Sequence, residues 1–263
     1  MQIVTSRDGT KIAYECKGTG PVLVLVGGAF SERAFSGWIE LIDALAGQFT
    51  IINYDRRGRG DSGDTAPYTV EREIEDLEAI IDDVGGSAIV FGMSSGAVLA
   101  LRAVASGLNI TQLALYEPPF MLTPDSRPPA DFESSLQQFI NADERGKAVH
   151  HFMVKGMGAP AFFIYMMRLF PAWSRLKAVA HTLPYDIAIM GDTMSGNPST
   201  IEQWRSIEVE TVVIDGEKSP ASLRNASQAL AKVIPDAQYS TLEGQSHKVS
   251  MTVLASRLKE YLA

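Results

Sequence analysis

The sequence has little of several features that mark other classes of protein. It holds one cysteine, Cys16, in 263 residues, so neither an intramolecular disulfide nor a zinc site made of several cysteines can form. Such usage is typical of a reducing compartment. Cys16 lies in the alternating run 11–16, and we expect a buried or half-buried packing residue in a strand rather than a thiol nucleophile. No uninterrupted apolar run approaches the ~20 residues that cross a bilayer.

Positive charge is also scarce. The 31 acidic residues outnumber the 23 basic ones, and the formal net charge is −8. A nucleic-acid-binding protein normally gathers basic residues into one patch. Here the densest basic stretch, 56–59, is interleaved with glycine and followed by Asp61 and Asp64, which indicates a structured turn. The N-terminus has no basic stretch followed by an apolar core. We therefore expect a cytoplasmic protein without nucleic-acid or membrane partners.

Short apolar runs alternate with longer segments of helical period, which predicts β-α-β units and a mostly parallel, doubly wound sheet. The clearest predicted strands are 22–26, 50–54, 88–91, 113–116, 211–214 and 238–242. Ile74, Leu77, Ile81 and Val84 recur every three or four residues, as on the buried face of a helix. Further helices are predicted over 223–234 and 249–262. The chain is thus expected to form an α/β protein.

The alternation breaks between residues 120 and 198, where helical stretches follow one another without a convincing strand. Prolines gather at the start of this segment and glycines at its end, as expected of connections. We interpret 120–198 as an inserted helical cap, and 1–119 together with 199–263 as the core that carries it.

The strongest motif is Gly-Met-Ser-Ser-Gly at 92–96, directly after a predicted strand and directly before an apolar helix. A serine at such a turn is held in a strained backbone conformation, with its hydroxyl raised above the sheet edge. Its place at a helix N-terminus favours developing negative charge. Ser94 is therefore the candidate nucleophile.

A serine hydroxyl needs a base to accept its proton. His150, His151 and His181 fall within 120–198, where a solvated surface position is expected. His247 instead follows the last predicted strand, and that loop should open on the same edge of the sheet as Ser94. His247 is therefore the candidate general base.

An oxyanion intermediate needs N–H donors beside the nucleophile. Ser95 supplies one backbone N–H. The segment after the strand 22–26 supplies the other: Ala29 is the first choice, with Gly28 and Phe30 as alternatives.

In their order and spacing these segments resemble the α/β-hydrolase superfamily over the whole chain. The resemblance implies a sheet of about eight strands. The segments that carry the likeness are Gly27-Gly28, Asp55-Arg56-Arg57-Gly58-Arg59-Gly60-Asp61-Ser62, the motif at 92–96, and Gly244-Gln245-Ser246-His247. In that family the first pair is usually His-Gly. The departure leaves the backbone donors in place but removes a side chain that commonly braces the turn.

The resemblance leaves the acid partner of His247 open. The family most often supplies it after the strand 211–214, where Ser219 stands at the expected aspartate position and Asp215 and Glu217 are nearby. Certain haloalkane dehalogenases instead carry a glutamate at the tip of the preceding core strand. Glu117 lies in a similar context, so we prefer Glu117 and keep Asp215 and Glu217 as alternatives.

The resemblance, together with a serine nucleophile, implies a hydrolase without metal or cofactor that cleaves a small to medium hydrophobic carboxylic ester, lactone or thioester through an acyl-enzyme. Methionines and aromatic residues in and near the cap suit an apolar pocket. The pocket candidates are Met93, Phe120, Met153, Met157, Phe163, Met166 and Met190. Alternatives are a non-hydrolytic scaffold that binds a hydrophobic ligand or acts on a biosynthetic intermediate, and a cofactor-free haloperoxidase or C–C hydrolase.

Overall fold

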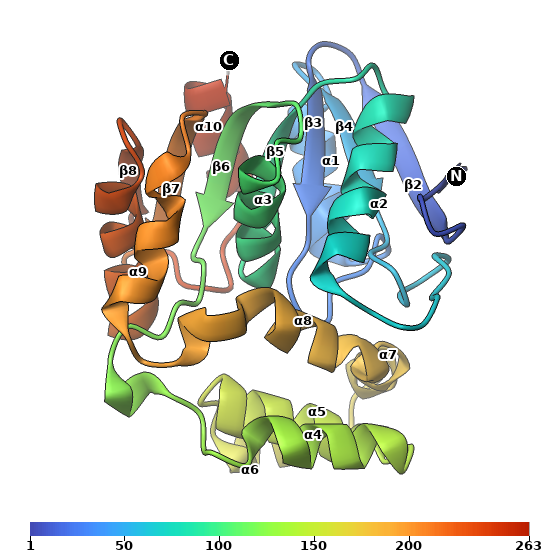
Figure 1. Cartoon of the computed structure of the whole chain (residues 1–263), viewed down its shortest axis with the longest axis vertical. Helices are drawn as coiled ribbons and strands as arrows, with labels where there is room; N and C mark the ends of the chain where they lie inside the picture. Colours follow the sequence, from blue (N-terminus) through green and yellow to red (C-terminus); the bar gives the residue numbers. More distant parts are fainter. Residues whose placement is uncertain (263) are drawn as a thin grey trace.

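The computed structural model describes residues 1–262 and is built around an eight-stranded sheet with strand order β1-β2-β4-β3-β5-β6-β7-β8 (Figure 1). The strands are β1 (Gln2–Thr5), β2 (Lys11–Gly18), β3 (Val22–Val26), β4 (Thr50–Tyr54), β5 (Ala88–Met93), β6 (Ile110–Tyr116), β7 (Glu210–Gly216) and β8 (Gln238–Leu242). β2 pairs antiparallel with β1 and β4, and all other pairs are parallel. The mostly parallel α/β sheet expected from the sequence is confirmed.

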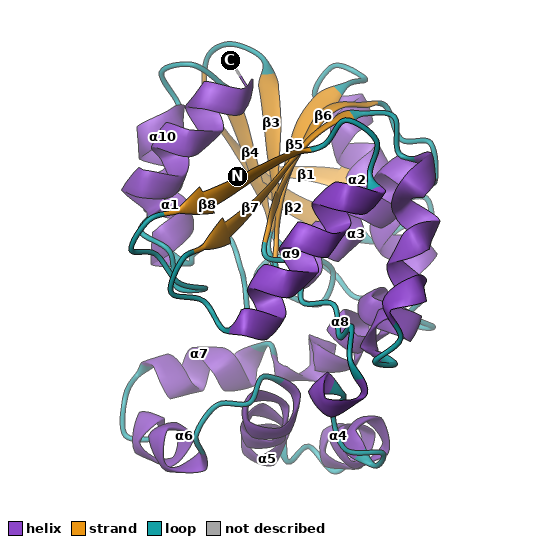
Figure 2. Ribbon diagram, turned by 90° about the vertical axis from the view of Figure 1, so that its left-hand side faces the viewer, coloured by secondary structure: helices purple, strands orange, loops and turns teal. Residues whose placement is uncertain are grey.

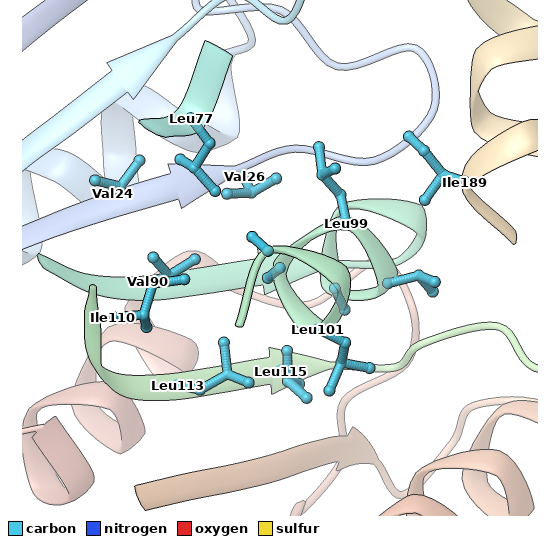
Figure 3. Close-up of a cluster of buried hydrophobic side chains, with 14 of the residues drawn as sticks. Val24, Val26, Leu77, Val90, Leu99, Leu101, Ile110, Leu113, Leu115 and Ile189 are labelled. Carbon is cyan, nitrogen blue, oxygen red and sulfur yellow. The ribbon is translucent and has the colours of Figure 1, made fainter. Parts of the chain in front are cut away.

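Helices cover both faces of the sheet, as parallel strands require. On one face lie α2 (Val70–Asp83), α3 (Ser95–Ala105) and α9 (Ala221–Val233), and on the other α1 (Ser36–Leu45) and α10 (Met251–Leu262). Alternate residues of β3 divide between the two: Val24 and Val26 join the α3 cluster, whereas Leu23 and Leu25 join the α1 cluster. Figure 3 shows part of the α3 cluster, with Leu101 on the side of Leu115 of β6 and Leu99 on the side of Val26 of β3.

The helical segment, residues 120–198, contains no strand and lies beyond the carboxyl ends of the parallel strands (Figures 1 and 2). Its elements are η1 (Pro124–Ser126), α4 (Phe132–Asn141), α5 (Arg145–His151), the π-helical turn η2 (Phe152–Gly156), α6 (Ala161–Met167), α7 (Ala172–Ala178), η3 (Ala180–Thr182), α8 (Leu183–Met190) and η4 (Gly191–Met194). The 3-10 helix η5 (Pro198–Ser206) follows before β7. In both views α8 lies between the sheet and α4–α6. A third apolar cluster, which includes Phe132, Leu136 and Trp173, holds the segment together.

Three features of the fold bear on expectations about single residues and elements. Cys16 lies in β2 as expected, but it is exposed rather than buried. The burial pattern of β2 changes from buried to exposed before this residue. Within residues 1–262, no helix combines the length and apolar character needed to cross a membrane. Over the same residues, no group of three or more His, Cys, Asp or Glu side chains is placed to hold a metal ion.

Candidate active site

Ser94 occupies the turn between β5 and α3 with φ 57° and ψ −128°. A non-glycine residue at this positive φ is strained, and such strain persists only where the surrounding structure holds it. Here the Ser94 N–H donates to the Tyr116 carbonyl, at 2.9 Å, on the neighbouring strand β6. The sharp strand-to-helix turn expected of the motif at 92–96 is therefore present, with Ser94 half-buried at the carboxyl edge of the sheet.

The loop after β3 lies against this turn. A Cβ added to Gly28 would come 2.9 Å from the Ser94 Cβ and 2.9 Å from the Met93 carbonyl oxygen, so only glycine permits this close approach. Phe30 has φ 65°, and Ala29 and Phe30 pack against the apolar cluster of the helical segment. The Phe30 ring meets Phe152 of η2 edge-on, with centroids 5.6 Å apart.

Backbone N–H groups without an acceptor occur in both segments that meet at this turn. Ser95 is the first residue of α3, where a backbone N–H has no acceptor within the helix. Within residues 1–262, the N–H groups of Ala29 and Phe30 also make no hydrogen bond. Gly28 thus lies against Ser94 and Ser95 follows it in sequence, and the N–H groups of Ala29 and Phe30 have no acceptor in the described part of the chain.

His247 lies in the loop between β8 and α10 and contacts a buried carboxylate. Its Nδ1 is 2.6 Å from Glu117 Oε2, and Glu117 is wholly buried while the histidine side chain is 29% exposed. The Gly216 N–H donates to the other oxygen, Glu117 Oε1, at 2.7 Å. The Tyr116 hydroxyl donates to the Ser246 carbonyl at 2.7 Å, which holds the loop beside β6. Both oxygens of Glu117 are therefore bonded, and one of them orients the ring.

The alternative carboxylates have other partners. Asp215 Oδ2 accepts a hydrogen bond from the Tyr239 hydroxyl at 2.6 Å, and Glu217 Oε2 accepts one from the Gly244 N–H at 2.8 Å. Over residues 1–262, neither carboxylate is hydrogen-bonded to His247. The structure thus pairs His247 with Glu117, the carboxylate preferred from the sequence.

Ser94 and His247 approach the same strand end from opposite sides. Ser94 is bonded through its backbone to Tyr116, and His247 is bonded to Glu117, the next residue. No hydrogen bond between the Ser94 hydroxyl and the His247 ring is formed in the described part of the chain. Catalytic hydrogen bonds often tighten only when substrate is bound. A hydroxyl, an imidazole and a carboxylate are the groups that such proton transfer needs, and Ser94, His247 and Glu117 bring them to the end of β6.

The other histidines are less solvated than expected. His151 stacks on Phe132, with ring centroids 5.1 Å apart, and its Nε2 lies 2.9 Å from the Phe132 carbonyl oxygen. His150 and His181 are partly buried. Burial and the nearby cation Arg145 lower the pKa of His181, and burial and Arg168 lower the pKa of His150. The expectation of solvated surface was wrong because α5 turns one face toward α4 and α7.

The apolar residues proposed for a pocket do not form one group. Phe120 and Met190 are buried in the α3 cluster, and Met93 packs partly against the cluster on the other face of the sheet. Met153 packs partly within the helical segment. Three others are exposed: Met157, Phe163 and Met166. Phe152 contacts Phe30 and therefore lies beside the candidate oxyanion donors.

Sequence reasoning missed one charged residue beside this site. Asp186, in α8, is 2% exposed and accepts a hydrogen bond from the Ser95 hydroxyl at 2.8 Å. Burial raises the pKa of a carboxyl, but Arg59 and Arg56 hold the Asp186 pKa below its usual value. The signal in the sequence was its isolation, since Asp186 is the sole acidic residue between Glu144 and Asp192 and lies in an apolar helix.

Comparisons with known proteins identify the family and the fold. Residues 22–261 match the model of the alpha/beta hydrolase family. The structure of an alpha/beta hydrolase from Sphaerobacter thermophilus is 52% identical and covers 100% of both chains with a TM-score of 0.92. A thermophilic esterase from Thermogutta terrifontis shares the fold at 20% identity and a TM-score of 0.71, covering 99% of this chain and 97% of the esterase.

Among curated proteins, the uncharacterized hydrolase YraK of Bacillus subtilis is 33% identical over 97 residues, 35% of each chain, so the matched part spans about a third of that relative. The family match extends over most of the sequence and takes in the serine turn, the glutamate at the end of β6 and the histidine loop. The chain belongs to the alpha/beta hydrolase family.

Proposed function

We propose that the protein is a serine hydrolase that cleaves a hydrophobic carboxylic ester, lactone or thioester, with Ser94 as nucleophile, His247 as general base and Glu117 as the acid that orients the histidine. The observation that carries the proposal is the 2.6 Å pair between His247 Nδ1 and the buried Glu117 carboxylate, formed at the strand end that also holds the Ser94 backbone.

The His247–Glu117 pair sets the direction of proton transfer. A proton on Nδ1 donates to the carboxylate, which leaves the lone pair on Nε2 to accept the Ser94 proton. As Ser94 Oγ bonds to the carbonyl carbon, its proton passes to Nε2 and the carbonyl oxygen takes up negative charge. Nε2 then returns the proton to the leaving alcohol or thiol, and an acyl-enzyme remains.

Deacylation repeats these steps with water. The water gives a proton to His247 Nε2 as its oxygen attacks the acyl carbon, and Ser94 recovers that proton as the acid leaves. In both steps the Ser95 and Ala29 N–H groups stabilise the oxyanion, with Gly28 and Phe30 as alternative donors. Preorganised donors of this kind contribute most where water is excluded.

The substrate class rests on the apolar side chains around residues 27–30, the loop after β3 that we call the oxyanion loop. Phe30 and Phe152 meet edge-on there, and Met153 packs within the same helical segment. An apolar acyl or alcohol group suits such a wall better than a charged one. In this proposal residues 120–198 form a cap over the core made of 1–119 and 199–263.

Turnover of p-nitrophenyl esters of short and medium acids by the purified protein, without added cofactor, tests the proposal. Ser94→Ala should remove turnover, with a fall of about 10⁴-fold or more in kcat, because nucleophile and base act as a unit. Ser106→Ala, at the other end of α3, is the matched control and should behave as the wild type. Unchanged activity in Ser94→Ala would contradict the proposal.

A fluorophosphonate separates hydrolysis from ligand binding alone. It labels only an activated hydroxyl, so one equivalent should attach at Ser94 in the wild type and none in Ser94→Ala. A protein that binds a hydrophobic ester but neither turns it over nor takes the label would instead be a binding scaffold.

A further inference from the structure

A buried cluster of four charges lies behind the oxyanion loop. Arg56, Arg59, Glu73 and Asp186 are each 2% exposed or less, and their formal charges cancel. Asp186 accepts from both arginines: Oδ1 from Arg56 Nη1 and Oδ2 from Arg59 Nη2, each at 2.7 Å. Glu73 binds Arg56 through two hydrogen bonds of 2.7 Å. Removal of one member would leave an uncompensated buried charge.

Both arginines also hold backbone carbonyls of the oxyanion loop. Arg59 Nη1 donates to the Gly28 carbonyl at 2.7 Å, and Arg56 Nη1 donates to the Gly27 carbonyl at 3.2 Å. The Gly28 carbonyl and the Ala29 N–H belong to one planar trans peptide unit, so they point in opposite directions. By fixing the carbonyl, Arg59 fixes the direction of the Ala29 N–H. A charged donor on the carbonyl also polarises the peptide, which strengthens that N–H as a donor.

Asp186 reaches the second donor as well. The Ser95 hydroxyl donates to Asp186 Oδ1 at 2.8 Å, and the Ser95 N–H is the other proposed oxyanion donor. One carboxylate therefore holds Ser95 directly and holds the Gly28–Ala29 peptide through Arg59. These contacts brace the turn that carries Gly27-Gly28.

We propose that Asp186 is a positioning residue for the oxyanion hole, which it aligns from the helical segment. The inference rests on the proposed function. Because Asp186 belongs to α8, the placement of the helical segment and the geometry of the two N–H donors are coupled. Asp186 touches neither substrate nor reacting atoms; it acts through Arg59 and Ser95.

The test compares Asp186→Asn with Asp76→Asn. Asp76 is likewise buried, at 1% exposed, and accepts two hydrogen bonds from a buried arginine, Arg57, at 2.7 and 2.8 Å, but neither residue contacts the oxyanion loop or Ser95. The loss of one oxyanion donor costs about 10²- to 10³-fold in kcat, and misalignment should cost about 10- to 100-fold. We expect Asp186→Asn to lower kcat by about 10- to 100-fold with little change in KM, and Asp76→Asn to leave kcat at the wild-type value.

A trifluoromethyl ketone supplies a readout that a merely structural role would not move. Its adduct with Ser94 places an oxyanion against the donors, so its Ki should rise in Asp186→Asn by the same factor as kcat falls, and should not rise in Asp76→Asn. If Asp186→Asn does not fold, Ser95→Ala provides the test. This variant keeps the Ser95 N–H and removes only the hydrogen bond from the Ser95 hydroxyl to Asp186. It should lower kcat and raise Ki by a smaller factor than is expected of Asp186→Asn.

The outcomes separate the two proposals. If the wild type hydrolyses esters but a folded Asp186→Asn or Ser95→Ala keeps wild-type kcat and Ki, only the role of Asp186 is overturned. Equal losses in Asp186→Asn and Asp76→Asn would overturn it too, because they would indicate general destabilisation. If the wild type turns over no ester and takes no fluorophosphonate label, the proposed function fails and this inference fails with it.

Discussion

The ends of the neighbouring strands β6 and β7 carry two buried carboxylates that differ in what they contact. Glu117 and Asp215 are both 0% exposed. Glu117 bonds His247, whereas Asp215 bonds Tyr239 and lies 3.9 Å from Arg224 of α9. Equal burial and equal chemistry thus lead to different partners, and the backbone explains the difference.

Strand alternation directs Asp215 away from the histidine. Val213 faces the α9 side of the sheet and Ile214 the α10 side, so Asp215, two residues after Val213, returns to the α9 side. Glu117 leaves β6 with φ 48°, which breaks the alternation and lets its side chain reach the histidine loop. A Cβ on Gly216 would come 2.7 Å from the Gln245 carbonyl carbon, so the same glycine that donates to Glu117 allows the loop to approach.

The largest expected effect comes from neutralising each carboxylate in turn. Glu117→Gln should lower kcat by about 10³- to 10⁴-fold, because a neutral amide neither orients the ring nor stabilises the imidazolium. Asp215→Asn should change kcat by less than about 3-fold, since it does not contact His247. Steady-state kinetics on one p-nitrophenyl ester measure both. A loss confined to Asp215→Asn would reverse our assignment of the acid.

A smaller loss is expected when the Glu117 charge is kept but its reach is shortened. Glu117→Asp removes one methylene, so the carboxylate withdraws from His247 Nδ1, and kcat should fall by roughly 10²-fold. Thermal stability should be retained, because aspartate tolerates positive φ better than glutamate does. Kinetics together with a thermal melt test this. If Glu117→Asp lowers kcat as much as Glu117→Gln does, a negative charge at a greater distance from His247 does not support catalysis.

On the β7 side we expect an effect on stability without one on rate. Tyr239→Phe removes the hydroxyl that donates to buried Asp215, and it should lower the free energy of unfolding by about 1–3 kcal/mol. Urea denaturation measures this change, and kcat should stay unchanged. Tyr261→Phe is the matched control, because the Tyr261 hydroxyl makes no hydrogen bond within residues 1–262. A fall in kcat in Tyr239→Phe would contradict this expectation and would indicate that Asp215, at the end of β7, also affects catalysis.

The smallest effect is a difference in alkaline stability. Burial and the hydrogen bond to Asp215 raise the pKa of Tyr239 above its ordinary value of 10.0. The unfolded phenol therefore ionises first, and the associated stability is present below pH 10 and is lost as pH rises through the folded pKa. Asp215→Asn should show a shallower loss above pH 10 than the wild type in urea titrations. Identical slopes would contradict the role of Asp215 in this shift.

Much of the fold could be predicted because its signals are local. The strands 22–26, 50–54 and 238–242 have the predicted bounds, and β5, β6 and β7 differ from prediction by one to three residues at their ends. Brief apolar runs bounded by glycine or charge define buried strands without long-range information. The turn at Ser94 could likewise be predicted, because it is formed by residues that are adjacent in sequence.

The candidate site was only partly predictable. The basic stretch 56–59 was correctly interpreted as structured, but the destination of Arg56 and Arg59 was missed because Asp186 lies 130 and 127 residues away from them. Cys16 and His151 were misplaced for a related reason, since exposure depends on which elements pack nearby.

The sequence by itself determined which segments become strands and helices, and it placed a serine, a glutamate and a histidine at the carboxyl ends of predicted strands. Only the tertiary structure decided which carboxylate meets the His247 ring and which groups brace the oxyanion loop. Those choices depend on strand parity, a single positive φ and contacts between residues about 130 positions apart, and none of these has a local signature.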